Sequence, residues 1–276
     1  MMERHAALTT DWNVLIAAAN AANTRGMVGV AVVGPGGEQW AYHGDRLFAA
    51  ASTVKIPIMV EVYRQIESGK LALGQPHTLT DDDRAGGSGV MRHLSAGMHF
   101  ALADLLYLMI SISDNTATNL LIRLAGMENI QRTMRDLGME RSTLARPMAG
   151  RLALPGEPEN FATAHDYTRA LVAILDGRAA GRESCDAMMA LLEKQQNSRR
   201  IARYLPPTAS IRWGSKTGSN AGVTNDAGFV IAPNGRLVIA VYTENCPDPH
   251  MGEQIIGDIA RAAMIATGIV GPLHPR

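Results

Sequence analysis

The spacing of apolar residues predicts helices through the middle of the chain. From residue 53 to 67 they recur every three or four positions, as Val54, Ile58, Val62 and Ile66, which is the period of one helix face. Stretches of similar character predict five more helices, at 103–111, 115–124, 128–137, 163–175 and 183–195.

Both ends of the chain carry short, β-branched apolar runs between turn residues. Met27 to Val33 leads through Gly34-Pro35-Gly36-Gly37 into a run from Glu38 to His43, which predicts a β-hairpin. Three more strands are predicted at 211–216, 224–231 and 237–243, with Pro233-Asn234-Gly235 turning between the last two.

Helices are also expected at the two ends, one capped near Thr10 or Asp11 and one over 252–267. The order of elements predicts an α/β (α+β) fold, in which one five-stranded antiparallel sheet is built from both termini. We expect a sheet domain from residues 1–45 and 200–276 and an all-helical domain from 46–199. The active site is expected in the cleft between them.

Composition excludes several classes of function. The chain has 276 residues, zero formal charge and 46% hydrophobic residues, which is typical of a globular domain. It has no long Lys/Arg run, so we expect no nucleic-acid partner, and we interpret Arg199-Arg200 with Arg203 as a solvated face. No apolar stretch approaches the roughly 18 residues of a membrane span. Cys185 and Cys246 are expected as free thiols, with a single bridge left open.

The amino terminus lacks the features of a secretory signal. Its apolar run from Val14 to Ala22 is interrupted by Asn20, and no basic segment leads into a continuous apolar stretch. We therefore expect a cytoplasmic protein, or a periplasmic or secreted one if an export signal preceded this sequence.

Lysine is rare, and two of its positions suggest chemistry. The chain has four lysines against 22 arginines, and Lys55 lies three residues after Ser52. A lysine can lose its proton when it is buried, whereas an arginine cannot. Ser52 with Lys55 therefore has the form of a nucleophile and its base, although a serine at a helix start also serves as an N-cap.

Two further triplets follow along the chain. Ser113-Asp114-Asn115 offers a hydroxyl to relay a proton and an amide to bind substrate, or else a helix-capping loop. Lys216-Thr217-Gly218, followed by Ser219, ends a strand-like run. It suits an edge strand that presents a cation and hydroxyls to an anion, with Gly218 admitting close backbone approach, or a plain strand ending in a turn.

Together the three motifs resemble those of class A β-lactamases and penicillin-binding proteins. The resemblance runs from the first hairpin to the last helix. Two further segments match in kind and position: Gly87-Ser88-Gly89 and Asn225-Asp226. The resemblance implies a five-stranded antiparallel sheet and a helical domain, with the site between them.

The resemblance also implies roles for individual residues. Ser52 would be acylated, Lys55 would accept its proton, Ser113 would pass a proton to the leaving nitrogen, and Asn115 would bind the substrate's side-chain amide. The substrate carboxylate would be held by Lys216, Thr217 and Ser219. The oxyanion hole would use the backbone N–H groups of Ser52 and of Ser219 or its neighbour, and Lys216 would help lower the pKa of Lys55.

One part of the family pattern is missing. Its hydrolytic members carry a glutamate on a loop, followed three residues on by Leu-Asn, and this glutamate activates the deacylating water. Here the loop from 146 to 160 contains only Glu157 and Glu159. Each is a weak candidate for the deacylation base. Both also suit the N-terminus of the helix expected near Ala162.

These features predict a β-lactamase-like serine hydrolase that opens β-lactams or related cyclic amides through an acyl-enzyme on Ser52. The alternatives are a cytoplasmic serine amidase or esterase with a non-antibiotic substrate, and a slowly deacylating penicillin-binding protein. We expect a small acyl substrate as the partner, and no metal or cofactor, because none of the histidines has a metal-ligand spacing.

Overall fold

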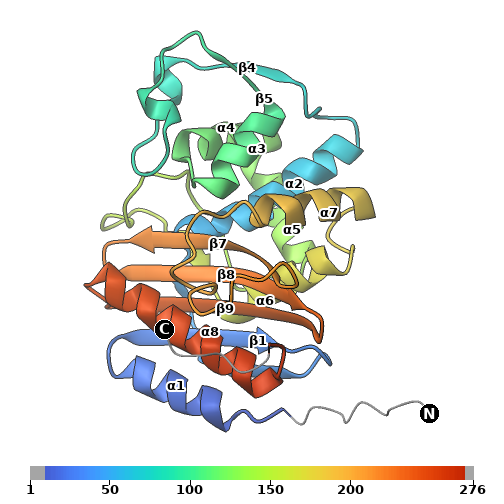
Figure 1. Ribbon diagram of the computed structural model, residues 1–276. Coiled ribbons are helices and arrows are strands. Elements are labelled where there is room, and N and C mark those ends of the chain that lie inside the picture. Colours follow the sequence, from blue (N-terminus) through green and yellow to red (C-terminus); the bar gives the residue numbers. More distant parts are fainter. Residues whose placement is uncertain (1–9, 271–276) are drawn as a thin grey trace, which may run out of the picture.

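The protein contains a five-stranded antiparallel sheet, against which α1 (Asn13–Asn23) and α8 (Pro249–Thr267) lie (Figure 1). The computed structural model describes residues 10–270. The strand order is β2-β1-β9-β8-β7. The strands are β1 Met27–Val33, β2 Gln39–Tyr42, β7 Arg212–Asn220, β8 Val223–Ala232 and β9 Gly235–Glu244. The two ends of the chain therefore meet in one sheet, as the sequence predicts.

Alternating side chains of the central strands supply two hydrophobic cores. On β1, Val30 and Val32 face the terminal helices α1 and α8, whereas Ala31 faces the helices of the middle of the chain. Residues on one strand point to opposite faces in turn, so a strand covered on both faces must be apolar throughout. This accounts for the continuous apolar run of β1.

The middle of the chain forms helices close to the predicted bounds. They are α2 Lys55–Glu67, α3 Leu102–Ser111, α4 Asn115–Ala125, α5 Met127–Asp136, α6 Ala164–Leu175 and α7 Arg182–Leu192. α2 is the central helix, and every residue from Lys55 to Tyr63 is buried. The buried cluster around it includes Phe229 and Tyr242 of the sheet, so helices and sheet share one core. A division into domains at residues 45 and 200 stays a prediction.

Several short elements have no signal in the sequence, because two to four residues are too few to show a period. They are β3 Phe48–Ala49, β4 Pro76–Thr78, β5 His99–Ala101, β6 Phe161–Ala162 and the 3₁₀ turns η1 Ala51–Val54, η2 Asp81–Asp83 and η3 Met91–His93. β3 pairs with β6, and the Ala50 amide donates to Asn160 O at 2.7 Å. The 146–160 loop is thereby tied to the segment just before Ser52.

Both cysteines are free and buried, as expected. Among the helices of residues 10–270, none is long and apolar enough to cross a membrane. The segment before residue 10, which was also assessed for a secretory signal, lies outside the described residues.

Candidate active site

Ser52 lies in a strained turn at the entrance to α2. Ala51, just before it, has φ +46°, a backbone conformation that residues other than glycine rarely adopt. Ser52 opens onto a cavity of about 440 Å³. β7 passes against this turn so closely that a Cβ on Gly218 would lie 3.2 Å from the Ser52 amide nitrogen. Gly218 therefore allows the close approach that the sequence predicts.

Lys55, the first residue of α2, is fully buried and reaches the second motif. Its Nζ donates to Ser113 O at 2.8 Å, to Ser113 Oγ at 2.9 Å and to Asn115 Oδ1 at 2.8 Å. Three acceptors suit the three hydrogens of an ammonium. Burial, with the nearby charge of Lys216, nevertheless holds the pKa of Lys55 well below its ordinary value, although Asp114 opposes the shift. The side chain is thus tightly placed and readily gives up a proton.

Asp114 holds the second motif in place. Its buried carboxylate accepts from the backbone amides of Ala117 at 3.0 Å, Val90 at 2.7 Å and Met91 at 2.8 Å. The cap that we considered as an alternative is therefore present. The cap does not exclude a role of the motif in proton transfer, because it leaves Ser113, at φ +60°, facing Lys55.

Lys216-Thr217-Gly218 lies within β7 and not at its end. The prediction that the strand stops at 216 is wrong, because Thr217 to Asn220 continue to pair with β8. β7 is an edge strand of the sheet, as expected. Lys216 is fully buried, and burial lowers its pKa to about 7; Arg200 adds to the shift and Asp226 opposes it.

Arg200 is a site residue that the sequence did not reveal. Its Nη1 donates to Gly218 O at 2.9 Å and to Asn225 O at 2.6 Å, and its Nη2 donates to Ser219 Oγ at 2.7 Å. Its interpretation as part of a solvated face is wrong, because strand ends more than 15 residues away bury it. Arginine pairs are common on surfaces, so no local signal marks this one.

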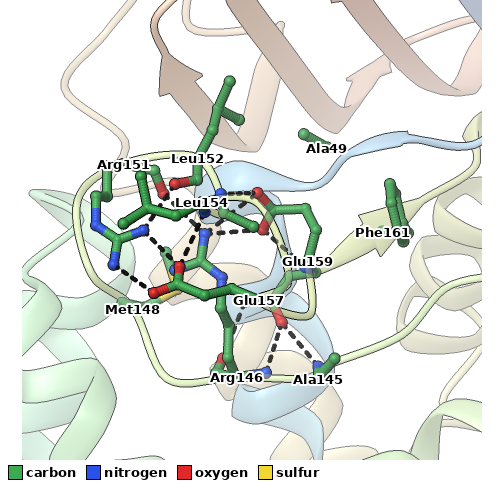
Figure 2. A network of polar contacts seen from close by, with 12 residues as sticks. Ala49, Ala145, Arg146, Met148, Arg151, Leu152, Leu154, Glu157, Glu159 and Phe161 are labelled. Carbon is green, nitrogen blue, oxygen red and sulfur yellow. Dashed lines mark hydrogen bonds and ion pairs between the residues drawn. The ribbon is translucent and has the colours of Figure 1, made fainter.

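Glu157 is paired with an arginine on the same loop, Arg151 (Figure 2). Arg151 donates to both of its carboxylate oxygens, at 2.6 and 2.9 Å, and the Leu154 amide adds a third bond at 3.0 Å. The Arg151 hydrogen bond is the main reason that the pKa of Glu157 falls to about 2. Glu157 is exposed and is not among the residues that line the cavity with Ser52.

Glu159 does line the cavity, but its carboxylate is fully engaged. It accepts from Arg146 Nη2 at 3.0 and 3.2 Å, from the Ala153 amide at 2.7 Å and from the Asn160 amide at 2.8 Å. Figure 2 shows both ion pairs within one folded loop. Neither glutamate sits at the start of α6, which begins at Ala164 and is capped by Thr163, so that alternative is wrong.

The sheet, the helical region and a cavity lined by Ser52 and Ser113, with the buried Lys55 bonded to Ser113, are the architecture of a serine hydrolase. A sequence model of the β-lactamase enzyme family matches residues 8–266, and the chain belongs to that family. It is a serine hydrolase of the class A β-lactamase type.

Individual relatives agree with this assignment. β-Lactamase Toho-2 of Escherichia coli is 30% identical over 254 residues, covering 88% of this chain and 84% of its own. A β-lactamase from Sphaerobacter thermophilus is 56% identical, covers 95% of this chain and 100% of its own, and superposes with a TM-score of 0.93. A mutant of PBP-A, solved as an acyl-enzyme complex with penicillin G, is 25% identical with a TM-score of 0.84. That likeness covers 94% of this chain and 97% of PBP-A.

Proposed function

We propose that the protein opens β-lactam rings through an acyl-enzyme on Ser52. The observation that carries this proposal is the contact of Lys55 Nζ with Ser113 Oγ, at 2.9 Å, beside the cavity into which Ser52 opens. It brings a buried amine of lowered pKa to Ser113, next to the cavity that Ser52 also lines, and an amine placed in this way can activate a hydroxyl nucleophile.

The reaction follows from these positions. Neutral Lys55 takes the Ser52 proton, directly or through Ser113, and Ser52 Oγ bonds to the lactam carbonyl carbon. The carbon–nitrogen bond of the ring then breaks, the nitrogen receives a proton from Ser113, and Lys55 returns the proton it holds to Ser113. The product of this half-reaction is an ester on Ser52, which water must cleave to release the acid.

Binding groups surround this centre. The substrate carboxylate would be held by Lys216, Thr217 and Ser219. Arg200 donates a hydrogen bond to the Ser219 hydroxyl and thereby orients it. The amide nitrogens of Ser52 and Ser219 would bind the developing oxyanion. Each such donor contributes about 2.7–4 kcal/mol in related hydrolases.

Asn115 would bind the amide of the substrate's acyl side chain. Its Oδ1 accepts from Lys55, and its Nδ2 donates one hydrogen to Gly86 O at 2.8 Å. The second hydrogen on Nδ2 remains for a substrate carbonyl. The PBP-A mutant forms an acyl-enzyme complex with penicillin G, which supports β-lactams as the substrate class of this protein.

Slow release of the acyl group is a second candidate, and the loop favours it. Glu157 does not line the cavity and is paired with Arg151, and Glu159 has its carboxylate saturated by Arg146 and two amides. A carboxylate oxygen that already accepts two hydrogen bonds has no lone pair left to take a proton from water. In this case the protein would behave as a penicillin-binding protein that acylates quickly and deacylates slowly.

Time-resolved intact-mass spectrometry with a penicillin tests both candidates. We expect an adduct of the penicillin's mass on the wild-type chain and on Ser88→Ala, which removes another serine of the cavity lining, but none on Ser52→Ala. An adduct that clears over many turnovers indicates a β-lactamase, and one that persists indicates the slow form. Adduct formation or turnover by Ser52→Ala would refute the proposal. Ser52-dependent cleavage of simple esters, with no penicillin adduct, would instead indicate the esterase alternative.

A further inference from the structure

Two loops that line the cavity touch through glycine backbones. Gly87 belongs to the loop between η2 and η3, and Gly150 to the 146–160 loop. A Cβ on Gly150 would lie 2.5 Å from Gly87 Cα, and a Cβ on Gly87 would lie 2.6 Å from Gly150 Cα. Neither position has room for a side chain, so the two main chains are in van der Waals contact. We call this the Gly87–Gly150 contact.

The contact lies at the Asn115 end of the cavity. A Cβ on Gly87 would also come within 2.5 Å of Asn115 Nδ2, and Asn115 Nδ2 donates to Gly86 O. The neighbouring Met148 is held on the same side, because its amide and carbonyl both bond to the Asn119 side chain, at 2.8 and 2.9 Å. Gly86 and Gly87 of one loop and Met148 to Gly150 of the other therefore form a continuous wall of the cavity next to Asn115. Hydrogen bonds to Asn115 and Asn119 hold the two loops in place.

The wall separates two cavities. Met148 and Ala149 line the Ser52 cavity and also a second cavity of about 650 Å³ behind the loop. Beside Ser113 and Thr217 the site is open, because Ser113, Asn197, Arg199 and Thr217 also line a neighbouring trench of about 590 Å³. The site is therefore closed by backbone at the Gly87–Gly150 contact and continues into a groove beside Ser113 and Thr217.

We propose that the Gly87–Gly150 contact limits the protein to β-lactams with compact acyl side chains. The proposal rests on the proposed function, in which Asn115 binds the acyl amide and so directs the acyl side chain toward this wall. Large substituents on the leaving-group side meet no such wall, because the trench beyond Ser113 and Thr217 receives them. A pocket that excludes a larger group discriminates by roughly 10–200-fold.

Acylation rates on a matched pair of penicillins test the proposal. The two share the nucleus and carboxylate and differ only in the acyl group, acetamido against dimethoxybenzamido. We expect the wild-type chain to react at least about tenfold faster with the acetamido compound. Two cephalosporins that share a compact acyl group and differ only in the size of the leaving-group substituent should differ by less than about threefold.

Gly150→Ala supplies the test of the contact itself. The new Cβ must push the two loops apart, so the preference for the compact acyl group should shrink by about tenfold. Gly156→Ala is the matched control, because Gly156 lies on the same loop with a similar φ, +86° against +72°, and a Cβ there meets nothing within 4 Å. It carries the same backbone strain without the clash and should keep the wild-type ratio.

The outcomes separate the proposals. A wild-type chain that acylates equally with both penicillins overturns the specificity proposal and leaves the Ser52 chemistry intact. An equal change of ratio in Gly156→Ala and Gly150→Ala, or none in either, overturns the role of the contact. Gly87→Ala repeats the test from the other loop if Gly150→Ala does not fold. Absence of both a Ser52 adduct and Ser52-dependent turnover with all four compounds overturns the proposed function itself.

Discussion

Raising the pH above neutrality should weaken the reaction with an anionic substrate, because Lys216 loses its charge. The free enzyme holds this lysine fully buried, and burial lowers its pKa to about 7 from an ordinary 10.5. Arg200 pushes the pKa further down, and Asp226 only partly offsets the two. Below about pH 7 the ammonium is charged and can bind the carboxylate. Above it the charged fraction falls roughly tenfold per pH unit.

The quantity to measure is kcat/KM for a penicillin across a pH series, since it reports the titration of the free enzyme. We expect an alkaline decline that begins near pH 7 and lowers kcat/KM by about tenfold by pH 8 and further by pH 9. The decline should level off where Arg200, which stays charged, becomes the remaining cation near the carboxylate site. An acidic limb should arise from protonation of Lys55.

Lys216→Arg is the decisive perturbation. A guanidinium keeps its proton throughout this range, so the alkaline limb should disappear while the acidic limb remains. Thermal unfolding of the variant should first show that the larger side chain is accommodated. A wild-type profile that stays flat to about pH 9, or a Lys216→Arg profile with an unchanged alkaline limb, would refute the assignment of this titration to Lys216.

Four further variants have defined expectations. Gly218→Ala places a Cβ 3.2 Å from the Ser52 amide and should slow adduct formation by about 10–100-fold, as measured by mass spectrometry. Asp114→Ala leaves three amides without an acceptor and should lower the urea-unfolding free energy by about 2–4 kcal/mol. Arg200→Gln should cost about 3–5 kcal/mol in the same assay and raise KM more than it lowers kcat. Met148→Glu adds a carboxylate to the cavity lining and should speed adduct loss by about 10²-fold. An unchanged value in any of these assays would contradict the reasoning for that residue.

Most of the fold could be predicted because its elements are long and their patterns are local. The helix from Lys55 onward and the strands at both ends show their periods within about ten residues. The pairing of strands from opposite ends also followed, since a lone hairpin cannot bury its apolar face. The features that the sequence did not predict are of two kinds. Some elements are too short to show a period, like β3 and β6, and others depend on a pairing partner, like the extension of β7 along β8 to Asn220.

The sequence alone determined the types and spacings of the reactive groups, above all Ser52, Lys55 and Ser113. Only the tertiary structure decided their chemical state. The lowered pKa of Lys55 needs burial and a second lysine 161 positions further along the chain, and the carboxylate of Glu159 is paired with Arg146 across its loop. Arg200 lies in the site because carbonyl groups of β7 and β8 accept its hydrogen bonds. Desolvation and charge act through space, so a pattern of neighbours along the chain cannot reveal them.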